Sequence, residues 1–399
     1  MTTKTAHRPC PVCNQTEVEI LHRQKFVLPD GHPLPDHFDV VACPDCGFVY
    51  ADTSGTPKDY DDYYSRYSKY ADQETSTGGG GNPKDQERLE ITADAIAAHL
   101  SGPEAKIVDI GCANGGLLGA LKARGFSTLL GVDPSPACVE NTKRLFDVPA
   151  SQGWLLDLPP ESAPADLVVV SHVFEHVLDL RAAIAKVEGI LSENGIVYVE
   201  VPDASRYAEC IAAPFQDFNV EHINHFDASS LKNLLGACGF EALDVGTKTL
   251  EAAEGVDYPA LFGFFRRARQ FTANAGWIRD EQFRLAMDDY IQKSADMLKC
   301  MDRRISEVAS EPVFVWGTGQ LTLKLLAETC LAQAPITAFV DGNPLNQGKH
   351  LHGIRILAPE ELSSLPAQPI IIGTLLHHHA IEKRIRENLR LSNRIITLV

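Results

Sequence analysis

The sequence predicts an α/β protein in three parts, and three observations lead to this prediction. Two Cys-x-x-Cys pairs near the N-terminus are typical of a small metal-held ribbon. Apolar runs then alternate with helical segments from residue 106 to residue 203, which predicts a parallel sheet covered by helices. A shorter alternation of the same kind returns after residue 311. We therefore expect an N-terminal zinc ribbon, a central α/β domain and a smaller C-terminal α/β domain.

The bulk properties of the chain restrict its class. It has 399 residues, of which 44% are hydrophobic and 22% charged, the balance of a globular protein with more than one domain. The formal charge of −17 repels nucleic acid and anionic membranes, so we expect neither as a partner. Apolar runs such as ADLVVVSHVF are too short to span a bilayer, and the opening MTTKTAHRPC has no apolar signal core. These features favour a cytoplasmic protein and leave its oligomeric state open.

Four cysteines near the N-terminus carry the strongest metal signal. CPVC at 10–13 and CPDC at 43–46 each predict a tight knuckle that aims two thiolates at one point. Two knuckles complete a tetrahedral site that suits zinc, with four ligands: Cys10, Cys13, Cys43 and Cys46. Because four thiolates leave no open position, we expect a structural zinc that stabilises a segment too small to fold alone. A catalytic metal or a redox dithiol is the alternative.

A Tyr-rich and Gly-rich segment follows at residues 59–83. Five tyrosines lie between positions 60 and 70, and four consecutive glycines occupy 78–81. One interpretation is a solvated linker with some packed tyrosines. The other is a lid over a ligand site, with the glycines as hinge and Tyr67 and Tyr70 as substrate contacts.

A Gly-rich turn and an acidic residue mark a candidate ligand site in the central part. KIVDIGCANGGLL at 106–118 predicts a buried strand, a turn and a helix, and LLGVDPS at 129–135 predicts a second strand that ends in Asp133. Glycines let the backbone approach a ligand closely, and an acid at the end of the next strand can hold ribose hydroxyls. The turn is GCANGG rather than GxGxxG, so the ligand need not carry a pyrophosphate.

Together with GWLLDLP at 153–159 and SHVFEHV at 171–177, these segments resemble the motifs of class I S-adenosylmethionine-dependent methyltransferases in order and spacing. The resemblance implies a Rossmann-like fold and seven cofactor-binding positions: Asp109, Gly111, Asn114, Gly115, Asp133, Asp157 and His172. Asp133 matches the ribose-binding acid. Trp154 stands where the family often has an adenine-side aspartate, which leaves Asp157 as the candidate there. His176 matches a family residue that is mostly structural.

The C-terminal part predicts a second, smaller Rossmann-like unit. PVFVWGTGQLTLKLL at 312–326 predicts a strand, a GxG turn and a helix, and Asp341 ends the next predicted strand. Gly317 and Gly319 either line a nucleotide-binding turn or serve packing alone. The three histidines at 377–379 point in different directions, which favours a helix start or a loop over a metal site. The expected domains are 1–75, 76–248 and 311–399, with a helical connection at 249–310.

This order of domains resembles the three-domain C-methyltransferases that act on nucleotide-linked 4-keto-deoxysugars. VDGNPLNQGKHLHGI at 340–354 is similar to a C-terminal motif of that family, with Asn346 where lysine is usual. The family also carries a Glu-His pair after the fifth strand, matched here in NVEHINHF at 219–226. The resemblance implies that His222 is the base for methyl transfer, with Glu221 as its partner and His225 as the less favoured base. Asn219 and Asn224 are candidate substrate contacts, and Asn219 replaces a tyrosine common in the family.

Three functions remain in competition at this point. The first is C-methylation of a nucleotide-linked keto-deoxysugar, in which a histidine of near-neutral pKa removes the proton beside the ketone and the resulting enolate takes the methyl group. The second is O- or N-methylation of a sugar or another small metabolite, which needs less help from a base. The third is a non-catalytic zinc-ribbon and Rossmann binding protein, in which NVEHINHF is a polar network that holds a loop.

Overall fold

The computed structural model describes every residue except 1, 68–82, 254–255 and 270–275, and leaves out the side chains of 65–67, 83–84 and 252–253. The described chain forms two compact units. The first contains residues 1–21, 40–210 and 221–286, and the second contains 22–39, 211–220 and 287–399. No helix among these described parts is both long and apolar enough to cross a membrane.

A seven-stranded sheet forms the centre of the first unit, in the order β11-β12-β9-β8-β5-β6-β7. Five neighbouring strands are parallel and follow the doubly wound order 3-2-1-4-5, whereas β12 runs antiparallel to both of its neighbours. This confirms the predicted parallel sheet. The strands are β5 (Ile107–Ile110), β6 (Leu129–Asp133), β7 (Ala150–Gln152), β8 (Ala165–Ser171), β9 (Leu191–Pro202), β11 (Phe240–Ala253) and β12 (Val256–Arg267).

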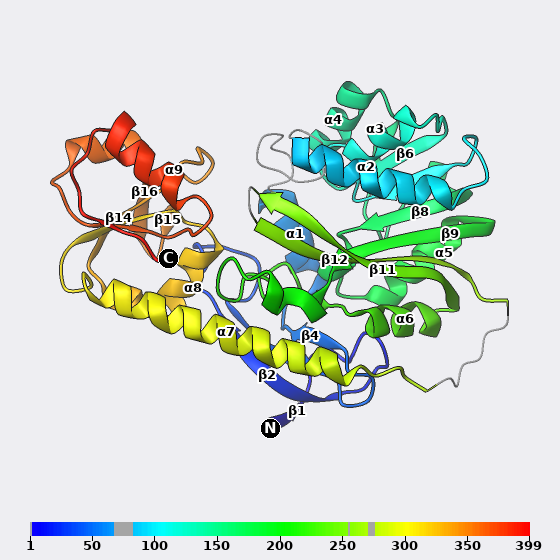
Figure 1. Ribbon diagram of the computed structural model, residues 1–399, viewed down its shortest axis with the longest axis horizontal. Coiled ribbons are helices and arrows are strands. Elements are labelled where there is room, and N and C mark those ends of the chain that lie inside the picture. Colours follow the sequence, from blue (N-terminus) through cyan, green and yellow to red (C-terminus); the bar gives the residue numbers. More distant parts are fainter. Residues whose placement is uncertain (1, 68–82, 254–255, 270–275) are drawn as a thin grey trace. The chain divides into compact units, whose positions relative to one another are not determined.

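Helices cover both faces of this sheet because alternate strand residues point to opposite sides. Val108 and Ile110 of β5 belong to a different buried cluster from Ile107, and Val168 of β8 is likewise separated from Leu167. Figure 1 shows helices on both faces of the sheet. The first face carries α2 (Pro83–Ala98), α3 (Gly116–Ala123) and α4 (Pro136–Phe146), and the second carries α5 (Leu180–Ile190) and α6 (Ala228–Ala237). Short 3-10 turns lie at Pro160–Ser162, Phe174–His176 and Ala204–Glu209.

The N-terminal segment contributes a second sheet, ordered β1-β2-β3-β4-β10. Its strands are β1 (Thr2–Thr5), β2 (Glu17–Lys25), β3 (His37–Ala42), β4 (Val49–Asp52) and β10 (Asn224–His225), and α1 (Pro57–Tyr67) follows β4. Cys10, Cys43 and Cys46 share a buried cluster with strand residues of the central sheet. Residues 1–21 and 40–67 therefore do not form the separate domain expected at 1–75, because they share a core with the central domain.

The second unit is built on a six-stranded sheet in the order β15-β16-β14-β13-β17-β18. Five of these strands are parallel, and in the sheet they lie in the order β16-β14-β13-β17-β18. Numbered along the chain, this is again the doubly wound order 3-2-1-4-5. The strands are β13 (Val313–Trp316), β14 (Ile336–Val340), β15 (His350–Leu351), β16 (Ile354–Leu357), β17 (Ile370–Ile372) and β18 (Ile395–Ile396). The helices are α7 (Glu281–Ser306), of which residues 287–306 belong to this unit, α8 (Gln320–Glu328) and α9 (His378–Lys383). Short 3-10 turns lie at Cys330–Gln333 and Pro359–Ser364, and a short π-helix lies at Arg384–Asn388.

The segment 249–310 was expected to be a helical connection, but its first part forms strands of the central sheet. Residues 256–267 form β12, which pairs with β9 and β11 within the central sheet. The aromatic content of LFGFF suits a buried strand, and a Gly at 263 lies under the ring of Phe265. Among the described residues of this segment, 281–306 form the long helix that helical spacing of apolar residues predicts.

Candidate active site

The predicted Gly-rich turn lies between β5 and α3, at the carboxyl edge of the central sheet. Gly111 has a φ of 76°, and its N–H donates to the carbonyl of Val132 at 2.7 Å. A Cβ at position 111 would lie 2.7 Å from Cγ2 of Val173, so only glycine lets the segment after β8 lean against the turn. Asp133 ends β6, and its carboxylate accepts from the N–H groups of Ala113 at 3.0 Å and Ser135 at 2.8 Å. The hydrogen bond from Ala113 therefore connects the Gly-rich turn to the carboxylate of Asp133.

Two buried acids lie at this edge of the sheet. Asp109 is 3% exposed and Asp133 is 7% exposed. Burial, together with the charge of Asp133, raises the pKa of Asp109 to about 7. Burial also raises the pKa of Asp133 to about 6, although the two backbone N–H groups that it accepts oppose this rise. The pair therefore gains charge over the physiological pH range, in contrast to ordinary surface carboxyls.

The other predicted cofactor positions differ in exposure. Gly115 has a φ of 81°, and a Cβ there would lie 2.6 Å from Thr142, so its role in the turn is explained by packing. Asn114 is fully buried and its side-chain oxygen accepts from Asn141 at 2.9 Å. Asp157 is exposed, and its backbone pairs with that of Trp154 in a tight turn. Trp154 is half-buried. The contact of Asp157 with an adenine stays a prediction.

His172 follows β8 and is held by two buried glutamates. Its Nδ1 lies 3.3 Å from Glu175 and its Nε2 lies 3.3 Å from Glu200. Burial by itself would lower the pKa of His172, but these two carboxylates outweigh it and raise the pKa to about 9. Burial would raise the pKa of Glu200, yet His172 and the Lys248 ammonium at 2.7 Å hold it well below its usual range. His172 therefore carries a positive charge at neutral pH.

The Glu221-His222 pair lies beside the turn that follows β8. The ring of His222 is 4.9 Å from that of His176, with the two planes at 71°. His176 Nδ1 is 3.0 Å from the carbonyl oxygen of Glu221, and because a carbonyl only accepts, Nδ1 carries the proton. Tyr63 of α1 donates to the Glu221 carboxylate at 2.6 Å. The structure therefore brings Glu221 and His222, on the loop before β10, next to His176, which lies on the segment that leans against the Gly111 turn.

Two residues of the same loop are buried and face the protein interior. The side chain of Asn224 donates to the carbonyls of Phe174 and Val177, each at 2.7 Å, and accepts from Arg8 at 2.8 Å. His225 is 0% exposed, and burial with the charge of Arg8 lowers its pKa to about 3. Asn224 is 1% exposed, so both side chains of β10 are buried. The substrate contact expected at Asn224 and the base expected at His225 stay predictions.

Three other expected substrate contacts lie in the second unit or outside what the structure describes. Asn219 belongs to the second unit, where its amide donates to the carbonyl of Gln216 at 3.4 Å. Tyr70 lies outside the described residues, as does the side chain of Tyr67. Tyr60 and Tyr63 of the same segment are buried, at 6% and 8% exposure, which agrees with packed tyrosines in the described part of the segment.

The four N-terminal cysteines converge, as predicted. Their sulfurs all lie within 4.8 Å of one another, with 3.6 Å between Cys10 and Cys46 and 3.3 Å between Cys13 and Cys43. Zn–S bonds of about 2.3 Å in a tetrahedron place sulfurs roughly 3.8 Å apart, so the cluster fits a zinc ion. Asn14 and Gly47 adopt positive φ values of 64° and 78°, which closes each knuckle.

A second group of side chains has metal-binding geometry. Glu175, His176 and His222 offer ligand atoms within 4.8 Å of one another. Glu175 is 1% exposed, and its Oε2 is buried with no hydrogen-bond partner among the described residues. Two imidazoles and one carboxylate form a donor set that divalent transition metals accept.

Sequence reasoning missed several residues that hold the site. Glu200 and Lys248 fix His172, Tyr63 fixes Glu221, and Arg8 donates to the carbonyl of Leu178 at 2.8 Å as well as to Asn224. Glu200 lies in the apolar run GIVYVEVPD, and this position could have indicated a buried polar cluster, because a charge inside an apolar strand needs a partner. The positions of the partners carried no such signal.

Two parts of the chain are similar to known protein families. Residues 83–245 match a family model described as a methyltransferase domain, and residues 309–397 match one described as C2185-like, N-terminal. The C-methyltransferase NovU of Streptomyces niveus is 27% identical over 263 residues, which cover 63% of this chain and 61% of that protein. Trans-aconitate 2-methyltransferase of Methylobacterium nodulans is 30% identical over 119 residues, which cover 29% of this chain and 46% of that protein.

The chain thus spans about three fifths of the length of the first relative and under half of the second. Among solved structures, magnesium protoporphyrin IX methyltransferase of Synechocystis PCC 6803 with bound SAH aligns with a TM-score of 0.42 and 14% identity, covering 53% of this chain and all of that one. The family match and the doubly wound sheet agree with the motifs in the sequence. Residues 83–245 form a class I S-adenosylmethionine-dependent methyltransferase domain.

Proposed function

We propose that the protein is an S-adenosylmethionine-dependent C-methyltransferase that acts on a nucleotide-linked keto-deoxysugar. The observation that carries this proposal is the place of His222, next to His176 on the segment that leans against the Gly111 turn. A base at that position lies close to the edge of the sheet that holds the proposed cofactor site. The similarity to a C-methyltransferase supports transfer to carbon.

The cofactor residues proposed here belong to the carboxyl edge of the sheet. Asp133 accepts the ribose hydroxyls, and the Gly111 turn lets the backbone approach the ligand. Asn114 and Asp109 support the turn from inside, and Asp157 is the candidate contact beside the adenine. S-adenosylmethionine supplies the methyl group. His172 contributes a positive charge at the cofactor side of β8.

The residues around His222 suit proton removal from carbon. In the proposed reaction a ring nitrogen of His222 accepts the proton beside the ketone, and the electron pair of the broken C–H bond passes to the ketone oxygen as an enolate. The enolate carbon would then attack the methyl carbon as the bond between that carbon and the sulfonium sulfur breaks, with the bonding electrons staying on sulfur in S-adenosylhomocysteine. The ketone would re-form, and the proton would leave His222 to solvent. Glu221 is held by Tyr63 at 2.6 Å, so its backbone carbonyl keeps the His176 ring fixed beside His222.

The zinc proposed at the four cysteines has a positioning role. β4 follows the second knuckle directly and pairs with β10, with Tyr50 opposite Asn224 and Val49 opposite His225. The N–H of Ala51 also donates to the carbonyl of Ile223, next to His222, at 2.9 Å. Zinc therefore holds the strand that sets the backbone of the 221–225 loop, and it takes no part in the chemistry.

The proposal is tested by hydrogen exchange and by methyl transfer. In deuterated water the wild type should exchange the hydrogen beside the ketone of the nucleotide sugar, and with labelled cofactor it should attach the methyl group to that carbon. His222→Gln should lower turnover by roughly 10²–10⁴-fold and stop the exchange, since the base is lost. Its cofactor affinity should stay the same. His37→Ala, at an exposed histidine, is the control.

A result in which His222→Gln retains both exchange and transfer contradicts the enolate mechanism. Methyl label found on oxygen or nitrogen contradicts transfer to carbon.

One observation favours a second candidate, O-methylation assisted by a metal. Glu175, His176 and His222 could hold a divalent cation that acidifies a substrate hydroxyl. Full transfer after exhaustive chelation, with zinc retained at the cysteines, excludes this candidate. Transfer that is lost on chelation and restored by Mn²⁺ or Mg²⁺ supports it over the first.

A further inference from the structure

We propose that Arg181 and Arg279 balance the charge of the zinc centre at the four cysteines, with one guanidinium on each Cys-x-x-Cys knuckle, and thereby slow the loss of the metal. This inference rests on the proposed zinc and is independent of the proposed substrate. Four thiolates outweigh the charge of one Zn²⁺ ion by two negative charges. Cys10, Cys43 and Cys46 are at most 3% exposed, so water offsets little of this excess charge.

The sequence of both knuckles leaves the thiolates short of backbone donors. Backbone N–H groups that point at a metal-bound sulfur offset part of its negative charge. In CPVC and CPDC the residue after the first cysteine is a proline, Pro11 or Pro44, which has no N–H. Each of these positions therefore contributes a carbonyl oxygen to the knuckle and no donor. A positive side chain near each knuckle compensates for the missing donor.

The first guanidinium lies on the first knuckle. Arg181 Nε donates to the carbonyl oxygen of Pro11 at 3.3 Å, and its Nη2 donates to that of Val12. Pro11 and Val12 are the two residues between Cys10 and Cys13. One planar and permanently charged group therefore binds both peptide carbonyls inside this knuckle.

The place of Arg181 in its helix is unfavourable without a negatively charged partner. Arg181 is the second residue of α5, and the N-terminus of a helix carries a partial positive charge that repels a cation. The N-cap acid, Asp179, accepts from the N–H of Ala182. Among the described residues, no carboxylate forms an ion pair with Arg181. An anionic zinc centre in the first knuckle explains why a cation stands at this position.

The second guanidinium lies on the second knuckle. Arg279 Nη1 donates to the carbonyl oxygen of Pro44 at 2.6 Å. The stem of Arg279 passes close to Gly47, since a Cβ at position 47 would lie 3.3 Å from Cγ of the arginine. Gly47 has a φ of 78°, so a glycine here both closes the knuckle and leaves room for the arginine. Arg279 also forms no ion pair with a carboxylate in the part of the chain that the structure describes.

A buried asparagine holds the backbone beside Arg279. Asn233 of α6 is 7% exposed, and its side chain pairs with both backbone groups of Ile278. It accepts from the Ile278 N–H at 3.0 Å and donates to the Ile278 carbonyl at 2.6 Å. Arg279 is the next residue in the chain. Its backbone is therefore fixed next to the second knuckle, although its side chain is exposed.

The two arginines differ from the other cation near the cysteines. Arg8 also lies close to Cys10, but its guanidinium donates to Leu178 and Asn224 and so supports the loop of His222. Arg181 and Arg279 instead donate to the knuckles themselves. A guanidinium beside an anionic centre lowers the free energy of the metal-bound state by Coulomb attraction. Residues that support metal ligands in this way typically change metal affinity about tenfold to a hundredfold.

Zinc release from the full-length protein tests the proposal. Zinc is first quantified in the natively purified chain, and its transfer to an excess of the chromophoric chelator pyridylazoresorcinol is then followed. Arg181→Gln should release zinc about tenfold faster than the wild type or more, since the charge on the first knuckle is lost. Arg279→Gln should show a smaller increase, because the exposed Arg279 side chain is screened by solvent.

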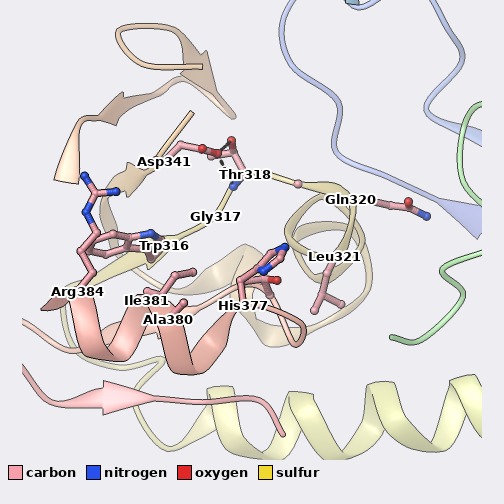
Figure 2. Close-up of a pocket in the computed structure, with 14 residues that line it drawn as sticks. Trp316, Gly317, Thr318, Gln320, Leu321, Asp341, His377, Ala380, Ile381 and Arg384 are labelled. Atoms are coloured by element: carbon pink, nitrogen blue, oxygen red, sulfur yellow. Dashed lines mark hydrogen bonds between the residues drawn. The ribbon is translucent and has the colours of Figure 1, made fainter. Parts of the chain in front are cut away.

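Lysine variants separate charge from a merely structural role. Arg181→Lys keeps the positive charge but loses the planar donor group, so it should recover most of the difference between Arg181→Gln and the wild type. An arginine of the second unit provides the matched control. Arg384 pairs with Glu360 at 2.7 Å, and Figure 2 shows it beside Trp316. Arg384→Gln should release zinc at the wild-type rate.

The possible results distinguish the arginines from the metal itself. Zinc at one per chain with equal release from wild type and Arg181→Gln overturns the role of the arginine and leaves the metal assignment standing. Release from Arg181→Lys as fast as from Arg181→Gln overturns charge balance as the cause. A wild type without zinc overturns the metal assignment and this proposal with it. If Arg181→Gln does not fold, Arg279→Gln and Arg279→Lys, which change an exposed side chain, decide in the same way.

Discussion

Tyr63 donates a 2.6 Å hydrogen bond to the carboxylate of Glu221, which lies 158 positions further along the chain. Both side chains are buried, at 8% exposure each, so the bond is sheltered from water. It connects α1, the first part of the Tyr-rich segment, to the residue that precedes His222. A segment that looked like a linker or a lid therefore supports the loop of the proposed base.

The variant Tyr63→Phe removes only this donor. We expect turnover to fall by roughly tenfold, since a buried carboxylate that loses a hydrogen bond costs about 1–3 kcal/mol or moves. The dissociation constant of S-adenosylmethionine should stay unchanged because Tyr63 is not among the residues proposed to hold the cofactor. Tyr60→Phe, one turn away on the same buried helix, is the control. Equal turnover of the two variants would show that Glu221 needs no support from α1.

Loss of the proposed zinc should act on the loop of His222 at a distance. Cys43→Ser should abolish zinc binding, loosen the pairing of β4 with β10, and lower turnover by roughly tenfold to a hundredfold, the effect of a small displacement of a catalytic group. Zinc content is measured on the natively purified protein, and cofactor affinity is measured alongside. Cys300→Ser, at an exposed cysteine of α7, should change neither. A wild type purified without zinc would refute the metal assignment.

Cofactor binding should depend on the charge of Asp133. The pKa of this carboxyl is raised to about 6, so it is ionised above that pH and neutral below it. A carboxylate accepts ribose hydroxyls better than a carboxylic acid, so the dissociation constant of S-adenosylmethionine should rise as pH falls below about 6, by up to tenfold per unit. Asp133→Asn should bind more weakly at neutral pH and lose this pH dependence. A wild-type affinity that is constant from pH 5 to 8 would place the ribose elsewhere.

The cluster of His172, Glu200 and Lys248 should make stability depend on pH in a defined window. The pKa of His172 is raised from 6.5 to about 9, so its contribution is complete below pH 6.5 and disappears as pH rises through 9. The pKa of Glu200 is held below its usual 4.5, so its contribution is complete above that pH and disappears in acid. The cluster therefore stabilises the fold most between about pH 4.5 and 6.5.

Glu200→Gln should destabilise the protein by about 3 kcal/mol near pH 6, because it leaves two cationic groups without a buried partner. The fall in melting temperature from pH 6.5 to 9 should also become shallower in this variant. Glu241→Gln breaks an exposed pair with Arg266 and should cost less than about 1 kcal/mol. If the melting temperatures of wild type and Glu200→Gln change with pH in the same way, the ionisation of His172 does not contribute to stability.

Features that depend on neighbours along the chain could be predicted from the sequence. Gly111 and Asp133 could be identified because a glycine turn and the acid of the following strand recur at a spacing set by one strand–helix–strand unit. The four cysteines could be assigned to one metal site because the two cysteines of each Cys-x-x-Cys are close along the chain and point to the same place. The parallel sheet could be predicted from the alternation of apolar and helical segments. The fold class and the methyltransferase motifs were predictable for this reason.

Tertiary structure alone decided which polar residues meet. Tyr63 and Glu221, or His172, Glu200 and Lys248, lie on segments whose side chains come together only when the sheet is assembled. It also separated His222 from His225. Both stand in one short polar stretch, but the pairing of β10 with β4 turns His225 into the core, whereas His222 precedes the strand and lies beside His176. Strand register sets which side chains are buried, and pairing between distant segments sets the register.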